Sequence, residues 1–360
     1  MTAAHLVAAG LLDAPEVSRT VGGIKALQRP DGAIPWFAGD KLDPWDHAES
    51  AMALDAAGEH EAARSAYLWL ARTQNADGSW FANYADTPEG VSAAAVADPT
   101  RETNFSAYPA VGIYHHYLAT ADRRFLRELW PTVVSAVEFV LRQQRTDGAI
   151  RWHPDSDEAL LSGCSSMYQA LRCAVATATA LGENQPGWEL ALSRLGHALT
   201  AHPERFAPKE RYSMDWYYPV LGTALRGEAA RRHIEEGWDR FVVPSLGVRC
   251  VDDHPWVTGG ESSELAIALW AIGRAEQARQ LLTDMGSRLR DKEDGMYWTG
   301  YVFADLAIWP QEKTSWTAGS VLLALAALGG EPATRAVFGG DALPKPLPVE
   351  CVAERCVSGR

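Results

Sequence analysis

The chain has 360 residues, of which 47% are hydrophobic and 22% are charged, and its formal net charge is −13. This composition is sufficient for a large folded core and excludes a disordered chain. The negative charge disfavours binding to phosphate backbones and anionic lipid, so we expect no nucleic-acid partner. The sequence has no run of about 18 apolar residues, so we expect no membrane span.

The cysteines are sparse and odd in number, which argues against a disulfide framework. They are Cys164, Cys173, Cys250, Cys351 and Cys356. The first residues of the chain lack a basic segment, and Asp13 interrupts their short apolar run, so they do not resemble a signal peptide. We therefore expect a cytoplasmic protein.

A short fragment recurs along the chain, and each copy follows an amphipathic helical run. The copies are QRPDGAIPW at 28–36, QNADGSW at 74–80, QRTDGAIRW at 144–152 and DKEDGMYW at 291–298. The preceding runs are 21–27, 62–73, 131–142 and 278–289. Each Asp-Gly pair predicts a turn with positive φ just past the end of a helix. Such a recurrence indicates helix pairs that close into a ring.

Further helical patterns lie between these copies, rich in Ala and Leu with apolar residues at helical spacing. In chain order they cover 47–58, 108–121, 165–183, 188–201, 217–227, 263–274 and 320–330. Many are apolar nearly all round, as the inner layer of a double-layered helical barrel requires. We find no clear run of alternating strand residues. The sequence therefore predicts an all-α protein, an α/α toroid (six-hairpin barrel) forming a single domain at 1–340, with a Pro-rich tail at 341–360 lying over it.

The loops before these apolar helices share one form: an aromatic residue, a carboxylate, and then the start of a helix. They cover 42–50, 98–105, 151–166, 211–220, 249–264 and 309–319. In a toroid the N-terminal ends of successive inner helices meet on one face. We therefore expect these segments to converge on one central pocket.

Aromatic faces stack on sugar rings, while carboxylates and Arg bind hydroxyls, so this mixture favours a small-molecule or oligosaccharide substrate. A single tryptophan is equally compatible with the core, and a single carboxylate with an ion pair or a helix cap. Asp46 in particular is placed to cap the helix that follows it. The predicted substrate-binding residues are Trp45, Asp46, Arg101, Glu102, Trp152, Asp215, Trp216, Asp253, Trp256, Glu261, Trp298 and Trp316.

Metal and cofactor signals are weak. His47, His153 and His254 each lie near an aspartate, but the sequence has neither HExxH nor paired CxxC. It also lacks a GxGxxG after a strand, a P-loop and a G-x-S-x-G elbow. We expect no metal site and no cofactor.

Residues 40 to 330 resemble the catalytic α/α barrel of glucoamylase-type inverting glycoside hydrolases. The similarity lies in 125–152 followed by 162–174, which resemble that family's long helix, DG turn, acid-bearing Trp loop and next helix. The segment 254–269 is similar to its later Pro-Trp loop, and 311–325 to its base-proximal Thr-Trp helix. This resemblance implies catalysis by a pair of carboxylates.

The same resemblance implies where the pair lies. In the family a Glu directly follows the Trp of the DG loop, whereas here His153 and Pro154 do. The nearest carboxylates are Asp155, Asp157 and Glu158, of which Glu158 or Asp157 is the expected general acid. Glu312 is the expected base, although it lies closer to the following Trp than the family's base does.

The Q-x-x-D-G-x-W fragments also resemble the QW repeats of squalene–hopene-type cyclases and prenyltransferase β-subunits. The D-x-D-D acid of the cyclases is absent, and Asp252-Asp253 matches it only in part. Three hypotheses therefore stand: an inverting glycoside hydrolase, which the residues favour; a terpene cyclase or prenyltransferase-like enzyme; and a non-catalytic glycan-binding protein on a degenerate hydrolase barrel.

Overall fold

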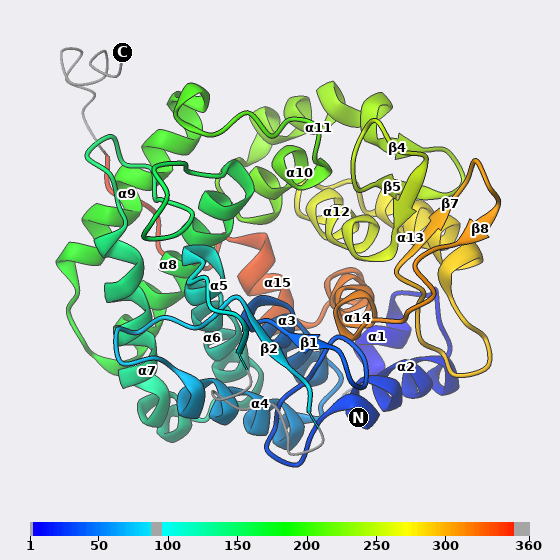
Figure 1. Ribbon diagram of the computed structural model, residues 1–360, viewed down its shortest axis with the longest axis horizontal. Helices are drawn as coiled ribbons and strands as arrows, with labels where there is room; N and C mark the ends of the chain where they lie inside the picture. Colours follow the sequence, from blue (N-terminus) through cyan, green and yellow to red (C-terminus); the bar gives the residue numbers. More distant parts are fainter. Residues whose placement is uncertain (1–2, 88–95, 349–360) are drawn as a thin grey trace.

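A computed structural model describes residues 3–87 and 96–348. Its helices form two concentric layers around one axis (Figure 1). Each inner helix packs on the next, and the last packs on the first, so the inner layer is closed. The inner helices are α3 (Pro44–Ala56), α6 (Pro109–Thr120), α8 (Leu161–Leu181), α10 (Ser213–Leu221), α12 (Gly259–Ala271) and α14 (Ser315–Gly329).

The outer layer alternates with the inner one along the chain, and each outer helix packs on an inner neighbour. Its helices are α2 (Ala14–Leu27), α4 (His60–Thr73), α7 (Arg123–Arg142), α9 (Pro186–Ala201), α11 (Gly227–Phe241) and α13 (Ala275–Leu289). Shorter helices are α1 (Ala4–Ala8), α5 (Thr103–Ala107), η1 (Pro203–Arg205) and α15 (Pro332–Gly339). The predicted all-α toroid is confirmed.

The inner helices, which are apolar nearly all round, are more completely buried than the amphipathic outer helices. Nearly every side chain of α12 and α14 is buried, because these helices have barrel neighbours on all sides. The outer helices α7 and α11 bury only one face. Apolar residues all round therefore mark the inner helices, and an apolar stripe marks the outer ones.

Each recurring DG fragment follows one outer helix and packs against an adjacent outer helix. Their glycines all have positive φ just after an outer helix, as predicted: Gly32, Gly78, Gly148 and Gly295. A Cβ on Gly78 would lie 2.0 Å from the carbonyl oxygen of Ser135 on α7. The side-chain amide of Gln74 donates to the carbonyls of Gly78 and Thr132, each at 3.0 Å. The fragment thus fixes the end of one outer helix against the middle of the next.

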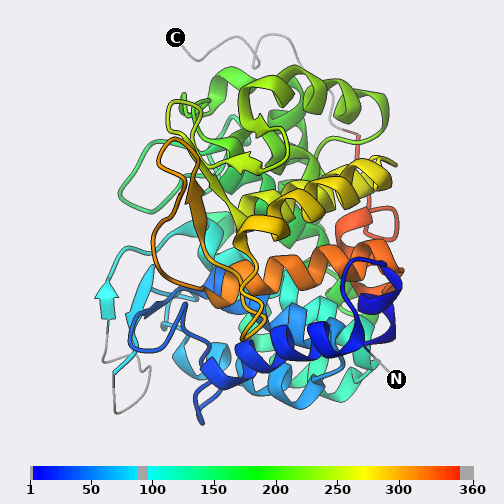
Figure 2. The same cartoon turned by 90° about the vertical axis from the view of Figure 1, so that its right-hand side faces the viewer.

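Short antiparallel strands, which the sequence analysis did not predict, lie among the loops at one end of the barrel (Figure 2). One sheet has the order β1-β2-β3 and the other the order β4-β5-β6-β7-β8. The strands are β1 (Lys41–Leu42), β2 (Asn83–Ala85), β3 (Val96–Asp98), β4 (Val242–Val243), β5 (Gly247–Arg249), β6 (Trp256–Thr258), β7 (Gly300–Val302) and β8 (Ala307–Ile308). Two or three residues are too few to give an alternating pattern.

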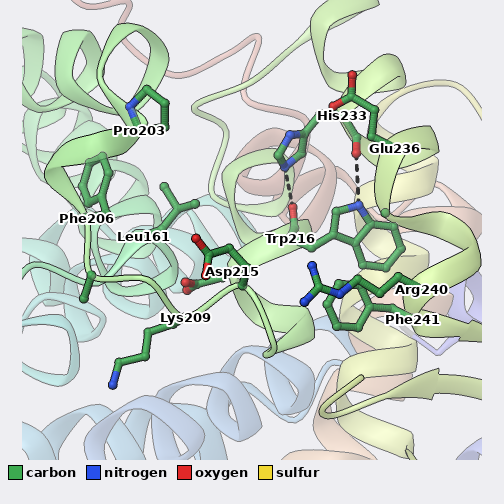
Figure 3. A pocket seen from close by; sticks show the side chains of 13 residues that line it. Leu161, Pro203, Phe206, Lys209, Asp215, Trp216, His233, Glu236, Arg240 and Phe241 are labelled. Atoms are coloured by element: carbon green, nitrogen blue, oxygen red, sulfur yellow. Dashed lines mark hydrogen bonds between the residues drawn. The ribbon is translucent and has the colours of Figure 1, made fainter. Parts of the chain in front are cut away.

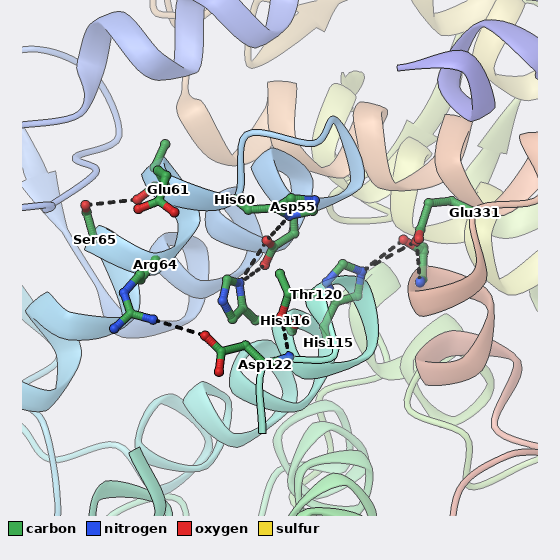
Figure 4. Close-up of polar contacts among 12 residues, drawn as sticks. Asp55, His60, Glu61, Arg64, Ser65, His115, His116, Thr120, Asp122 and Glu331 are labelled. Carbon is green, nitrogen blue, oxygen red and sulfur yellow. Dashed lines mark hydrogen bonds and ion pairs between the residues drawn. The ribbon is translucent and has the colours of Figure 1, made fainter. Parts of the chain in front are cut away.

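A buried polar cluster ties α3 to α4 and α6 near the C-terminal end of α3 (Figure 4). The carboxylate of Asp55 is 3.0 Å from Nδ1 of His60 and 2.9 Å from Nδ1 of His116. The hydrogen bond with Asp55 raises the pKa of His60 above its ordinary value. Nearby, Glu331 caps α15 and lies 3.9 Å from His115. These contacts fix the inner helices at the end of the barrel away from the loops.

The first part of the expected tail, 341–348, lies against the barrel. The guanidinium of Arg172, buried in α8, donates to the carbonyls of Gly340, Leu343 and Pro344. Residues 349–360, with Cys351 and Cys356, lie outside the described residues.

Within the described residues, no single helix is long and apolar enough to cross a membrane. Helices α14 and α15 meet that test only as a pair, which is bent by 97°. The burial of α14 inside the barrel accounts for its apolar composition.

A buried histidine in α3 makes a testable contribution to stability. Nδ1 of His47 accepts from the backbone N–H of Ile34 at 3.1 Å, so Nε2 carries the proton and donates to the carbonyl of Ala66 at 3.0 Å. Burial lowers the pKa of His47 from 6.5 to about 4. Between those pH values the unfolded chain binds a proton that the native state does not. The free energy of unfolding therefore falls as pH drops through this window, by up to about 3 kcal/mol.

Chemical denaturation at pH 7 and pH 4.5 measures this contribution. We expect the wild type to lose more stability between the two pH values than His47→Gln does. His254→Gln, which changes an exposed histidine, should behave like the wild type. Equal losses in wild type and His47→Gln would contradict the assignment.

Candidate active site

One pocket, with a volume of about 570 Å³, lies on the axis of the barrel at the end where the inner helices begin. All six aromatic–carboxylate loops contribute to its wall, as predicted. The tryptophans that line it are Trp36, Trp45, Trp152, Trp256, Trp309 and Trp316. The carboxylates that line it are Asp43, Asp46, Glu102, Glu261, Glu264 and Glu312. The pocket is therefore both aromatic and acidic.

The first turn of α3 positions two of the aspartates. Asp43 is the N-cap, and its carboxylate accepts from the backbone N–H of Asp46 at 2.8 Å and from the indole N–H of Trp36 at 2.8 Å. The expected cap, Asp46, is instead one turn further along, with its side chain in the pocket wall. Capping by Asp43 leaves the Asp46 carboxyl available for a substrate.

The carboxyl of Asp46 is strongly biased towards its protonated form. Burial raises its pKa well above the ordinary value, and the carboxylate of Asp43 raises it further. The carboxyls of Glu49, below the pocket, and of Glu264, in its wall, add to this effect. Because Asp43 accepts two hydrogen bonds, the negative charge of the pair is better stabilised on Asp43 and the proton on Asp46.

A second pair of carboxyls lies in the barrel interior. Glu49 is fully buried, and neither of its oxygens has a hydrogen-bond partner among the described residues. Glu264 accepts hydrogen bonds from the hydroxyls of Tyr217 and Tyr218. Burial raises the pKa of Glu49 well above its ordinary value and that of Glu264 to about 8. The negative charges of two buried carboxylates favour protonation of neighbouring carboxyls, including that of Asp46.

Glu261 lies in the first turn of α12, and α12 and α3 both pack on α14. Glu261 is buried, lines the pocket, and its Oε2 has no hydrogen-bond partner among the described residues. The residue before it, Gly260, touches the Trp316 ring so closely that a Cβ would lie 2.4 Å from it. Trp316 of α14 is thus held beside Glu261.

Polar contacts fix several rings of the wall. The indole N–H of Trp152 donates to Glu102 at 2.8 Å, and that of Trp256 donates to the carbonyl of Trp309 at 2.7 Å. Nζ of Lys41 lies 3.8 Å from the centroid of the Trp36 ring. Oriented aromatic faces interleaved with hydroxyl-binding carboxylates match the mixed polarity of a sugar.

Most of the predicted binding residues meet in this pocket. Those that line it are Trp45, Asp46, Glu102, Trp152, Trp256, Glu261 and Trp316, together with the expected base, Glu312. Burial raises the pKa of Glu312, whose carboxylate is 3.4 Å from the hydroxyl of Thr299.

The other predicted binding residues lie elsewhere, each with a contact that accounts for it. Arg101 pairs with Asp77 at 2.9 Å, and exposed Asp253 pairs with Arg211 at 2.8 Å. Trp298 lies under the ammonium group of Lys313. The remaining two, Asp215 and Trp216, line a separate pocket.

The two residues expected to supply the acid, Asp157 and Glu158, do not line the pocket. Both are exposed, and the Asp157 side chain is 99% exposed beside Arg151. The backbone N–H of Trp152 donates to the carbonyl of Glu158, which closes this loop on itself. Its Trp side chain lines the pocket while its carboxylates lie in solvent.

Five residues that the sequence analysis did not select have a clear place in the site: Trp36, Asp43, Glu49, Glu264 and Trp309. Trp36 was detectable as the last residue of the first DG fragment. Glu49 and Glu264 follow Asp46 and Glu261 by three residues in a helix, which places them on the same face one turn deeper.

The sequence and the fold were compared with those of known proteins. No protein-family model matches the chain. The MMP endo-(1,4)-3-O-methyl-alpha-D-mannosidase of Mycolicibacterium hassiacum is 48% identical over 342 residues, which cover 94% of this chain and 93% of the relative.

Solved structures with the same fold are more distant in sequence. A wild-type glycosidase aligns with a TM-score of 0.70 at 15% identity, over 88% of this chain and 99% of its own. A D-mannose isomerase aligns with a TM-score of 0.65 at 10% identity, over 87% of this chain and 96% of its own. A rhamnosidase from Klebsiella oxytoca with rhamnose bound aligns with a TM-score of 0.60 at 16% identity, over 87% of this chain and 64% of its own. Given its identity with the mannosidase over nearly the whole of both chains, the protein belongs to that mannosidase's family and is a glycoside hydrolase of the α/α-barrel type.

Proposed function

We propose that the protein cleaves internal α-(1→4) bonds in a chain of 3-O-methyl-D-mannose units. The 48% identity with a mannosidase named for that substrate supports this. The chemistry of the pocket agrees, because a methylated sugar presents more apolar surface than an ordinary one. Trp256, Leu160 and Met214 provide apolar contacts in the pocket wall, while Glu102 and Glu312 provide acceptors for hydroxyls.

Asp46 is the proposed general acid, and its position in the pocket wall beside buried Asp43 is the observation on which this assignment mainly rests. An acid must hold its proton at the working pH and release it to the leaving oxygen. The pKa of Asp46 is raised by burial and by Asp43, so its proton is retained towards neutral pH. The rate should fall as pH rises through this raised pKa.

Glu261 is the proposed base. Glu261 lines the pocket, and its Oε2 has no hydrogen-bond partner among the described residues, so its carboxyl can accept a proton from a water in the pocket. Asp46 protonates the glycosidic oxygen, while the base activates a water on the opposite face of the sugar ring. Attack by that water inverts the anomeric centre. Glu312, expected from the sequence to be the base, is assigned here to hydroxyl binding.

Product analysis on matched polymers tests the function. We expect mixed oligosaccharides from α-(1→4)-linked 3-O-methylmannan, with a kcat/KM at least about tenfold above that for the unmethylated chain of the same linkage. NMR during the first turnovers should show the β-anomer at the new reducing end. Release of single sugars from chain ends, equal rates on both polymers, or no cleavage of either would contradict the proposal.

A further inference from the structure

A second pocket has a volume of about 280 Å³ and adjoins the active-site pocket. Figure 3 shows the side chains that line it. Leu161 and Asp215 line it, while their chain neighbours Ser162 and Met214 line the active-site pocket. The backbone N–H of Ser162 donates to the Asp215 carboxylate at 3.0 Å across this boundary. The first turns of α8 and α10 therefore form a single wall between the two pockets.

The floor of the second pocket is apolar and firmly held. The rings of Trp216 and Phe241 stack with centroids 5.3 Å apart and planes 18° apart. Trp216 and His233 exchange two hydrogen bonds, each side-chain nitrogen donating to the other residue's carbonyl, at 3.1 and 2.7 Å. Phe206 and Leu161 continue the apolar surface. Because these contacts join α10 to α11, the floor is preformed.

The rim carries charged groups that are available to a ligand. Lys209, Glu210 and Glu236 line the pocket, and their side chains form no hydrogen bond or ion pair with any residue that the structure describes. Arg240 is engaged, since its guanidinium donates to Asp252 at 2.6 Å. The rim thus offers both donors and acceptors around an apolar floor, as a sugar requires.

We propose that this second pocket is a distal subsite, which binds one sugar unit of the chain whose scissile bond lies in the active-site pocket. The inference rests on the proposed endo-hydrolysis, because only a chain cut internally extends beyond the catalytic carboxyls. The apolar face and methyl group of a 3-O-methylmannose unit pack on Phe206 and Leu161, and its free hydroxyls bond to Lys209 and Glu236. The volume is just below the range of roughly 300–1,000 Å³ for drug-sized ligands, which suits a single ring.

Two variants test the subsite without touching the catalytic groups. The double change Lys209→Ala with Glu236→Ala removes the hydroxyl partners, and Ala207→Trp places a bulky ring in the pocket wall. We expect each to raise KM for the long methylated chain about fivefold, with kcat unchanged. KM for a short oligomer that fills only the active-site pocket should not change. Lys292→Ala, in a different pocket beside Glu16 and Tyr297, is the matched control.

The outcomes separate the subsite from the proposed function. An unchanged KM for the long chain in both variants, with unchanged melting temperatures, would overturn the subsite, as would an equal rise on the short oligomer. If the wild type cleaves neither substrate, calorimetric binding of the long chain to Asp46→Asn, with and without the double change, decides the question. Fivefold weaker binding with the double change supports the subsite, and equal binding or no binding overturns it.

Discussion

Replacing Asp46 with Asn is expected to lower kcat on the methylated chain by about 10³-fold, within the range for loss of a general acid. Asn retains the shape of the side chain but has no proton to give the leaving oxygen. Because Asp43, not Asp46, caps α3, the fold should survive the change. Initial rates with a melting temperature for each protein measure the effect, and Asp155→Asn, at an exposed position, is the control.

The chemistry of the leaving group separates an acid from a residue that is merely structural. A mannosyl fluoride or an activated aryl mannoside departs without protonation, so Asp46→Asn should retain most of its rate on such substrates. The alkaline limb of the wild-type pH profile, set by the raised pKa of Asp46, should be absent in the variant. An equal loss on natural and activated substrates would contradict the acid role.

Replacing Glu261 with Gln is also expected to lower kcat by about 10³-fold, but on natural and activated substrates alike. Water must be activated whatever group departs, so a better leaving group does not rescue the loss. Single-turnover rates on both substrate types provide the comparison.

Glu312→Gln is the matched control for this prediction, because Glu312 is a carboxyl residue that lines the same pocket. Loss of a residue that only binds a substrate hydroxyl should raise KM by a few fold and leave kcat nearly unchanged. If Glu312→Gln were inactive and Glu261→Gln active, the base would be Glu312, as the resemblance to glucoamylase-type enzymes implied.

The fold could be predicted from the sequence because its rules are local. Gly78 needs positive φ, and a Cβ would clash with Ser135 of the next outer helix, and the same turn recurs after α2, α7 and α13. The apolar composition of α14 marks an inner helix without knowledge of its neighbours. The strands, such as β1 and β6, depend on pairing between distant loops, and two or three residues carry no periodic signal.

The site was predictable to the extent that it follows from the fold. Convergence of inner-helix starts brought Asp46, Glu261 and Trp316 together, as expected for a toroid. The direction of a loop side chain does not follow from that rule, and Asp157 lies in solvent although Trp152 of the same loop lines the pocket. Which carboxyl holds a proton depends on burial and on neighbours such as Asp43, and these come only from tertiary structure.

A crystal structure of Asp46→Asn with a 3-O-methylated α-(1→4)-mannan oligosaccharide tests the central claim most directly. Our account predicts a glycosidic oxygen within hydrogen-bond distance of residue 46, with Glu261 holding a water on the opposite face of the ring. The separation between the two side-chain carbonyl carbons should be roughly 6.5–9.5 Å, the range for inversion. A sugar bound with its glycosidic bond away from both residues, or with Glu312 rather than Glu261 facing the anomeric carbon, would contradict the account.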